Sequence, residues 1–186
     1  MSEIYSPEED SYLMSNYLEK TLPELIKKNL DLKFLEIGAG SGIILNSAFN
    51  SGIKKENILG TDINLDAVKT CKKEGFQCVF SNLFDNIKGK FDIITFNPPY
   101  LPLDRLEPKD SRIITTGGKK GDELIIKFLK QAKNYLRPGG VILLITSSLS
   151  NKTNIKKFGY TLRELDSKKL FFEKITLWEL KLKPFL

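Results

Sequence analysis

Short apolar segments alternate with amphipathic segments along most of the chain from residue 33 onward. Five apolar runs have the length and composition of buried strands, at residues 34–37, 58–62, 76–80, 91–96 and 141–146. Between them, the helical spacing of apolar residues predicts helices over 43–50, over 65–74, and from a cap at Asp122 to Leu136. The Arg-Pro-Gly-Gly segment at 137–140 is expected to end the last helix and turn the chain into the fifth strand. This alternation predicts an α/β fold with a parallel sheet covered by helices on both faces.

The two ends of the chain depart from this alternation. Segments 160–165 and 171–182 are strand-like and have no helix between them, so they are expected to form an antiparallel pair at one end of the sheet. Near the N-terminus, an apolar helical stripe is interrupted by Pro23; its members are Met14, Leu18, Leu22 and Leu25. Because proline is tolerated in the first turn of a helix, a second short helix is expected to start there.

Length and composition favour a single domain over residues 1–186, since a chain of 186 residues with 41% apolar side chains can bury a sizeable core. The N-terminus lacks the profile of a signal peptide, and no apolar run approaches the length of about 18 residues that a membrane span needs. A cytoplasmic protein without membrane attachment is therefore expected. Cys71 and Cys78 could pair, but buried free thiols are the favoured interpretation for that compartment.

The chain contains no histidine. This excludes nucleophilic catalysis by Ser-His or Cys-His pairs and the usual histidine-rich zinc sites, and two cysteines alone cannot complete a structural zinc site. No metal site is expected. Any chemistry must therefore use amides, carboxylates, backbone groups or a cofactor.

The net charge of +6 is unevenly placed. Residues 151–186 carry nine Lys and Arg against four Asp and Glu, whereas residues 1–30 carry three against six. A basic C-terminal face could attract RNA, DNA or an acidic protein, or it could be a solvated lysine-rich surface. Composition leaves both interpretations open.

A glycine-rich loop at residues 38–42, with Gly38 and Gly40, directly follows the first strand. Ligands of doubly wound sheets lie beyond the carboxyl ends of the strands, and glycine lets the backbone approach a ligand closely. A dinucleotide fingerprint would have glycine or alanine where this chain has Ile43. S-adenosylmethionine fits better than NAD, because Glu36 can attract its cationic end while loop N–H groups meet its carboxylate. A tight structural turn is the alternative.

Two further polar residues follow neighbouring strands. Asp62 ends the second strand, where its carboxylate can accept hydrogen bonds from both hydroxyls of a ribose. Asn82 follows the third strand, where its amide oxygen can accept a bond from the adenine amine. The structural alternatives are a helix cap for Asp62 and a plain turn residue for Asn82.

The fourth strand ends in Asn97-Pro98-Pro99-Tyr100, at the same edge as the glycine loop. A planar NH2 group is a poor nucleophile because its lone pair is delocalised. The Asn97 side-chain oxygen and the Pro98 carbonyl can each accept one N–H, which directs the lone pair out of the plane toward a methyl donor. The prolines fix these acceptors in advance, and the Tyr100 ring can stack on the planar group. These four residues are the candidate catalytic residues, and an ordinary loop after a strand is the alternative.

The segments FLEIGAGSG, TDIN and FNPPY, in this order, resemble the class I S-adenosylmethionine-dependent methyltransferases that modify planar amines. YSPEEDS at 5–11 and GGKKGDE at 117–123 narrow the resemblance to the short archaeal and eukaryotic members of the HemK-like branch, which methylates the glutamine of class I release factors. The resemblance implies a Rossmann-like, mostly parallel seven-stranded sheet with a C-terminal antiparallel strand pair. It also implies that the helical segment 1–30 packs over the cofactor site.

The resemblance assigns roles to individual residues. It implies that S-adenosylmethionine is bound by Ser11, Glu36, Gly38, Gly40, Asp62, Asn82, Leu83 and Asn97, and that the target amine is bound by Asn97, Pro98, Pro99 and Tyr100. Asn82 departs from the family, which often has Asp at this position. The 117–123 loop is expected to be a lid near the substrate or a flexible connector. A class I release factor is the implied substrate, and a small zinc-binding activator subunit is a partner that such members often have.

Other methyl acceptors stay open on the sequence alone. The same acceptor geometry suits adenine N6 or guanine N2 of DNA or RNA, although an enzyme of that kind usually carries an additional recognition domain. Short relatives are also linked to lysine methylation, for which a cationic amine must first lose a proton. A non-catalytic cofactor-binding or RNA-associated module would not need an amine-orienting motif.

Overall fold

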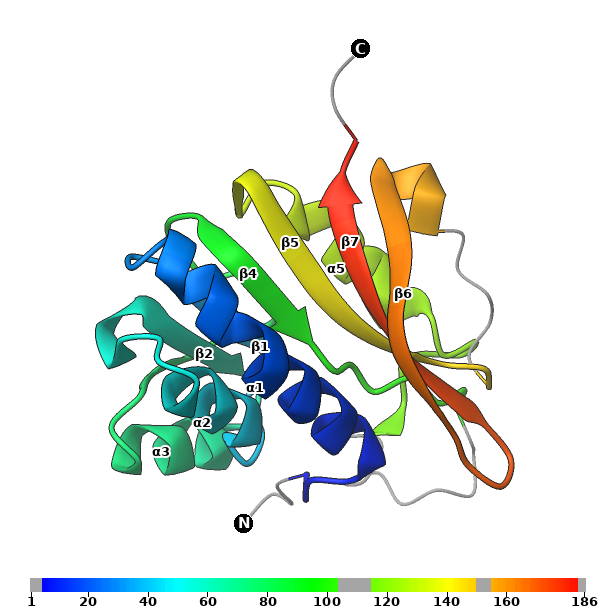
Figure 1. Ribbon diagram of the computed structural model, residues 1–186. Helices are drawn as coiled ribbons and strands as arrows, with labels where there is room; N and C mark the ends of the chain where they lie inside the picture. Colours follow the sequence, from blue (N-terminus) through cyan, green and yellow to red (C-terminus); the bar gives the residue numbers. More distant parts are fainter. Residues whose placement is uncertain (1–4, 104–114, 150–154, 184–186) are drawn as a thin grey trace.

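The structure is a computed structural model that describes residues 5–103, 115–149 and 155–183. A seven-stranded sheet forms its centre, in the order β3-β2-β1-β4-β5-β7-β6 (Figure 1). The strands are β1 (Phe34–Ile37), β2 (Ile58–Asp62), β3 (Gln77–Phe80), β4 (Phe91–Phe96), β5 (Leu136–Ser147), β6 (Tyr160–Lys169) and β7 (Lys174–Leu182). The first five are parallel to one another, while β7 runs antiparallel to β5 and β6. The predicted Rossmann-like sheet with an antiparallel pair at one end is confirmed.

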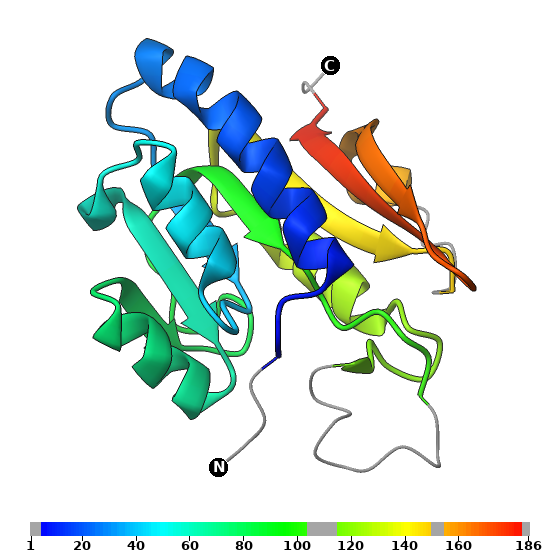
Figure 2. The same ribbon diagram turned by 60° about the horizontal axis from the view of Figure 1, so that its bottom comes forward.

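Helices cover both faces of the sheet (Figures 1 and 2). They are α1 (Glu9–Lys28), α2 (Ile43–Asn50), α3 (Leu65–Lys73) and α5 (Glu123–Ala132), with the short 3-10 helices η1 (Lys55–Asn57) and η2 (Ile155–Phe158). One buried apolar cluster joins α1, α2 and α3 to the sheet, and a second joins α5 to its opposite face. Neighbouring strand residues such as Ile93 and Ile94 belong to different clusters. Because these strands are buried on both faces, their sequences are mostly apolar and do not alternate between apolar and polar residues.

The parallel strands bring their carboxyl ends to one edge of the sheet. The glycine loop follows β1 at this edge, and the Asn-Pro-Pro-Tyr segment follows β4, which pairs with β1 in parallel. Figure 2 shows that the N-terminal end of α1 reaches the same edge. Segments that are far apart in the sequence therefore meet where ligands of this fold class bind.

α1 is one continuous helix, so the prediction of a second short helix near Pro23 is wrong. Pro23 lies inside the helix, where it removes one backbone N–H. Met14, Leu18 and Leu22 are fully buried in the first apolar cluster, and their packing holds the helix together across the proline. Leu25 is 41% exposed and does not belong to the buried stripe.

The Arg-Pro-Gly-Gly segment does not end a helix, contrary to the prediction. α5 ends earlier, at Ala132, and β5 already begins at Leu136. Leu136 and Val141 both pair with β4, which leaves the segment between them as a bulge within the strand. Arg137 Nη1 lies 2.8 Å from Asp92 Oδ2 on β4 and ties the bulge to its neighbour. Strand pairing, which the local sequence does not reveal, overrides the turn signal.

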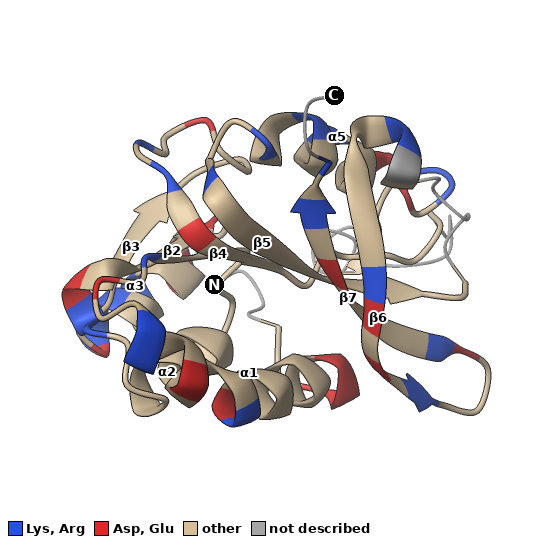
Figure 3. Cartoon of the chain, turned by 45° about the horizontal axis from the view of Figure 1, so that its top comes forward, with Lys and Arg blue, Asp and Glu red and all other residues tan. Residues whose placement is uncertain are grey.

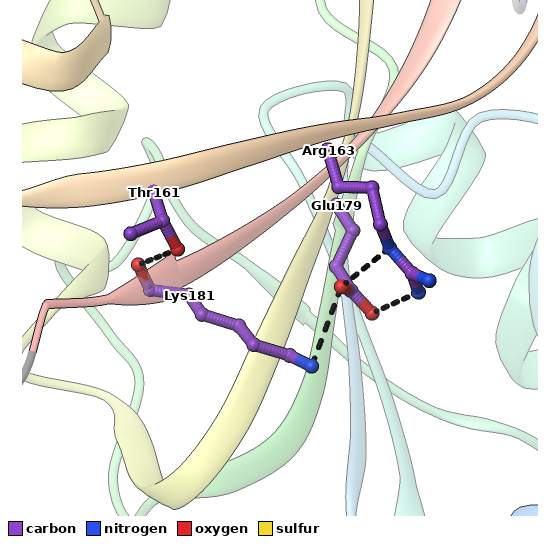
Figure 4. Close-up of polar contacts among 4 residues, drawn as sticks. All are labelled: Thr161, Arg163, Glu179 and Lys181. Carbon is purple, nitrogen blue, oxygen red and sulfur yellow. Dashed lines mark hydrogen bonds and ion pairs between the residues drawn. The ribbon is translucent and has the colours of Figure 1, made fainter.

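The β6–β7 hairpin carries charges of both signs. β6 extends further than predicted, and residues 171–173 belong to the turn rather than to β7. Lys and Arg interleave with Asp and Glu along the two strands (Figure 3). Glu179 accepts from Arg163 Nε at 3.1 Å, and Lys181 Nζ lies 3.3 Å from the same carboxylate (Figure 4). In its described part, the C-terminal segment therefore presents mixed charge rather than a uniformly basic face.

Both cysteines, Cys71 and Cys78, are buried free thiols, as the sequence predicted. Among the helices of the described ranges, none combines the length and the apolar character that a membrane span requires. In the same ranges, no group of three or more Cys, Asp or Glu side chains is arranged to hold a metal ion.

Candidate active site

A cavity of about 480 Å³ lies at the carboxyl edge of the sheet. Loops that follow β1, β2, β3 and β4 line it together with the start of α1. All of the site residues suggested by the sequence line this cavity: Ser11, Glu36, Gly38, Gly40, Asp62, Asn82, Leu83, Asn97, Pro98, Pro99 and Tyr100. The structure thus brings the candidates together in one place, while their individual roles stay predictions.

The glycine loop is fixed to the end of β2. The N–H of Ala39 donates to the Thr61 carbonyl at 2.8 Å, and the N–H of Gly40 donates to Asp62 Oδ2 at 2.8 Å. The N–H of Gly42 donates back to the Ala39 carbonyl. Three N–H groups of the loop therefore already have partners within the protein. Fewer loop N–H groups are left to donate to a cofactor carboxylate.

Glu36 is a buried acid with one unsatisfied oxygen. Its Oε2 has no hydrogen-bond partner among the described residues, although the residue lines the cavity. Burial raises the pKa of Glu36 well above its usual value, and the nearby Cys71 and Asp62 raise it further. An ionised carboxylate in such surroundings is costly unless a cation lies beside it. The position is therefore suited to a cationic ligand group.

Asp62 connects the glycine loop to α3. Its Oδ2 accepts from Gly40, and its Oδ1 accepts from the N–H of Asn64 at 2.7 Å. Burial raises the pKa of Asp62, and these backbone N–H groups partly counter the shift. The cap of α3 is Asn64, whose side chain accepts from the Asp66 N–H, so Asp62 is not the helix cap. Each carboxylate oxygen has a second lone pair, which leaves Asp62 able to accept from ribose hydroxyls.

Asn82 and Leu83 follow β3 and line the cavity. Asn82 is exposed, and its amide oxygen accepts from Lys127 Nζ on α5 at 3.3 Å. Leu83 is buried with φ of +55°, and the Ser81 hydroxyl donates to its carbonyl at 2.9 Å. Such strain in a non-glycine residue costs about 1–3 kcal/mol and is concentrated at ligand sites. An adenine at this place could pack on Leu83 but would share the Asn82 oxygen with Lys127.

The segment after β4 holds a second unsatisfied oxygen. Asn97 Oδ1 is buried and has no hydrogen-bond partner among the residues that the structure describes. Leaving a buried acceptor without a donor costs about 1–3 kcal/mol, and native proteins rarely do so without a functional reason. Pro98, Pro99 and Tyr100 line the same cavity. An N–H group that entered the cavity would satisfy the Asn97 oxygen.

Asp10 is a cavity residue that sequence reasoning did not single out. The hydroxyl of Tyr5 donates to its carboxylate at 2.9 Å, and that of Tyr100 donates to it at 3.2 Å. Burial raises the pKa of both tyrosines, and the charge of Asp10 raises it further, so both hydroxyls stay protonated and donate. Asp10 thereby ties the start of α1 to the Asn-Pro-Pro-Tyr segment. Its place inside the YSPEEDS segment was the available signal.

The 117–123 loop is hydrogen-bonded to the residues that follow Tyr100. The N–H of Gly117 donates to the Leu101 carbonyl at 2.9 Å, and the N–H of Leu103 donates to the Gly118 carbonyl at 3.0 Å. The loop therefore extends along the chain that leaves the candidate catalytic segment. The lid and connector roles expected from the sequence stay predictions.

Two glycines of this loop approach the candidate catalytic segment more closely than any other residue could. A Cβ at Gly121 would lie 2.5 Å from the Tyr100 carbonyl oxygen, and one at Gly117 would lie 2.6 Å from the Pro99 carbonyl oxygen. Side-chain carbons do not come this close to a carbonyl oxygen, so only glycine permits the observed packing. The loop therefore packs directly against the backbone carbonyls of Pro99 and Tyr100.

Comparison with known proteins agrees with this geometry. A model of the methyltransferase small domain family matches residues 15–171. A Methanocaldococcus jannaschii protein with the provisional name protein N5-glutamine methyltransferase is 38% identical over 193 aligned positions, which cover 96% of this chain and 93% of the relative. The mouse protein named methyltransferase HEMK2 is 31% identical, with 83% of this chain and 77% of the relative covered.

A solved structure resembles nearly the whole chain. It belongs to the E. cuniculi Mtq2–Trm112 complex, described as responsible for methylation of the eRF1 translation termination factor. The TM-score is 0.73 at 24% identity, with 97% of this chain and 99% of the other covered, which shows a common fold. The family match over most of the sequence and the 38% identical relative show that the chain belongs to the methyltransferase small domain family.

Proposed function

We propose that the protein is an S-adenosylmethionine-dependent N-methyltransferase that methylates the glutamine side chain in the Gly-Gly-Gln loop of a class I translation release factor. Relatives with high coverage bear the names N5-glutamine methyltransferase and HEMK2, and the solved structure of similar fold belongs to a complex that methylates a termination factor. These names support the substrate class, and the chemistry of the cavity supports it independently.

The observation that carries the proposal is the unsatisfied oxygen of Asn97. A carboxamide nitrogen has two N–H groups in one plane, and Asn97 Oδ1 is a buried acceptor in the cavity without a donor of its own among the described residues. If the Pro98 carbonyl accepts the second N–H, the amide is held flat and its lone pair points out of the plane. The nitrogen becomes acidic as it gains the methyl group, so no strong base is needed and the absence of histidine is no obstacle.

The cavity also suits the methyl donor. When bound, S-adenosylmethionine supplies a methyl group on a positively charged sulfur, together with a cationic amine. Glu36 offers a buried carboxylate whose Oε2 lacks a partner in the described structure, and it would hold this positive charge. Asp62 would accept from the ribose hydroxyls, and Leu83 would contact the adenine. The loop with Gly38 and Gly40 would lie along the methionine end.

The charge of the cavity favours a protein acceptor over a nucleic acid. Among the described lining residues, every charged side chain is acidic: Glu8, Asp10, Glu36, Asp62 and Glu173. This arrangement is notable in a chain of net charge +6, because phosphate groups are bound by Lys and Arg. A neutral glutamine amide is tolerated there, whereas a phosphate backbone near the reacting base would be repelled. A lysine acceptor would also be tolerated, provided its ammonium loses a proton.

We further propose a small zinc-binding activator subunit as a partner. The supporting structure is the Mtq2–Trm112 complex, in which a protein of similar fold is paired with a second subunit. Exposed apolar side chains gather at the edge strand β3 and the start of α3, namely Ile63, Leu65 and Phe80. Co-expression of the chain with such a subunit tests this partner, and elution of the two proteins separately in size-exclusion chromatography would argue against it.

A single transfer experiment tests the proposed reaction. The protein, alone and together with the proposed activator subunit, is incubated with methyl-labelled S-adenosylmethionine and, in separate reactions, with a class I release factor, DNA or RNA. Mass spectrometry then maps the labelled residue. Label on the glutamine of the Gly-Gly-Gln loop is the expected result. Label on a lysine or on a nucleobase would replace the proposed substrate with that acceptor, and no transfer to any of the three would refute the proposal.

A further inference from the structure

The turn between β6 and β7 exposes two adjacent phenylalanines. Phe171 is 100% exposed and Phe172 is 90% exposed, with their rings 6.5 Å apart. The turn is closed by the N–H of Leu170, which donates to the Glu173 carbonyl at 2.8 Å. Single exposed apolar residues are common, but two neighbouring aromatic rings at nearly full exposure are unusual unless they serve an interaction.

This turn lies at the rim of the active-site cavity. Glu173, directly after the two phenylalanines, is itself a lining residue of the cavity and accepts from the Ser147 hydroxyl at the end of β5. Glu173 lines this cavity together with Tyr100 of the candidate catalytic segment. Figure 1 shows the hairpin extending beyond the sheet on the side where α1 begins.

Strand pairing holds the hairpin in this position. β7 pairs with β5 from Ile175 to Lys181, and Lys168 on β6 also forms an ion pair with Glu9 at the start of α1. The apolar tip is therefore presented by an anchored hairpin. A rigid, pre-positioned aromatic contact loses little conformational entropy when a partner binds it.

We propose that residues 170–173 form a docking surface for the protein that carries the methyl acceptor. The inference rests on the proposed function, because an amide on a folded protein can enter the cavity only if that protein covers part of the rim. Two exposed phenylalanines on the rim provide apolar contact, and aromatic anchors of this kind often dominate binding at protein interfaces.

The charges around the turn favour a protein rather than a nucleic acid as the occupant. A nucleic acid would need free Lys or Arg beside the aromatic rings to neutralise phosphates. Of the three lysines around the turn, Lys168 and Lys174 are engaged by glutamates. Lys169 has no ion pair among the described residues, but Glu173, beside the rings and lining the cavity, offsets its charge. An apolar surface bordered by charges of both signs, without an excess of free cations, is complementary to a protein surface that carries apolar and charged side chains.

A double substitution, Phe171→Ser with Phe172→Ser, tests the docking surface. Leu30→Ser is the matched control, since Leu30 is 71% exposed and lies beyond the C-terminal end of α1, away from the cavity. Steady-state methylation of a purified class I release factor is measured for the wild type and both variants, with cofactor affinity from calorimetry and folding from thermal unfolding. The double variant should raise KM for the release factor at least about tenfold. Its kcat and cofactor affinity should stay within about twofold of the wild type, as should every parameter of the control.

The contrary outcomes are distinct from one another. An unchanged KM in a folded double variant would overturn the docking surface while leaving the proposed reaction intact. Loss of binding to a co-purified activator subunit, with KM for the release factor unchanged, would assign the turn to that subunit and also overturn the inference. Failure of the wild type to methylate any release factor would refute the proposed function on which the docking surface rests.

Discussion

Replacing Gly121 with alanine tests whether the 117–123 loop fixes the backbone of the candidate catalytic segment. The added Cβ would lie 2.5 Å from the Tyr100 carbonyl oxygen and 3.0 Å from the Pro102 nitrogen. Ordinary contact begins at 3.4 Å, so the loop or the segment must move by roughly 0.9 Å. A displacement of about 1 Å at a reacting centre lowers the rate on the order of 100-fold. We therefore expect kcat for methyl transfer to fall about 100-fold, while cofactor affinity changes by less than about threefold.

Gly139→Ala provides the matched control. Gly121 and Gly139 have φ values of +83° and +77°, so each substitution introduces a similar backbone strain of about 1–2 kcal/mol. A Cβ at Gly139 would meet nothing within 4 Å, and this residue lies in the β5 bulge. Thermal unfolding should show destabilisation of both variants, larger in Gly121→Ala because of the added clash, whereas single-turnover transfer should be slow only in Gly121→Ala. Equal transfer rates in the two variants would refute the positioning role of the loop.

Three further substitutions test separate parts of the structure. Glu36→Gln removes an acid whose folded-state pKa is raised above 4.5; because the unfolded chain ionises first, the wild type should lose stability relative to the variant as the pH rises above 4.5. Cofactor affinity should rise with pH more steeply in the wild type than in Glu36→Gln. If the wild type and the variant showed the same pH dependence, both of stability in unfolding and of cofactor affinity in calorimetry, the assignment of Glu36 would be contradicted. Asp62→Ala should weaken cofactor binding at least about tenfold in calorimetry, and an unchanged affinity would remove Asp62 from the site. Glu179→Ala should lower the free energy of unfolding in urea by no more than about 1 kcal/mol, because its partner Arg163 is mostly exposed; a loss above about 3 kcal/mol would show a buried network instead.

Local sequence predicted the elements whose character is set by burial. Strands such as β1 and β4 are mostly apolar because both faces are covered, and the residues that follow them reach the cavity because parallel strands end at one edge. The predictions that were wrong depended on distant contacts. Pro23 stays within α1 because Leu18 and Leu22 are packed on the sheet, and the segment after Leu136 joins β5 because β4 pairs with it.

The candidate site shows the same division. Residues directly after a strand, such as Gly38 after β1 and Asn97 after β4, could be placed from the sequence because their position follows from the fold. The contact between Asp10 and Tyr100 joins residues 90 positions apart, and no local pattern specifies it. The close approach of Gly121 to Tyr100 likewise becomes visible only when the two backbones are placed side by side.

The central claim is that the Asn97 oxygen orients the acceptor nitrogen, and single-turnover transfer by Asn97→Ala tests it most directly. Methyl transfer to a class I release factor is followed after rapid mixing, and cofactor affinity is measured on the same preparation. We predict a rate at least about 100-fold below that of the wild type, with cofactor affinity within about tenfold. A wild-type rate in a folded Asn97→Ala protein would contradict the claim.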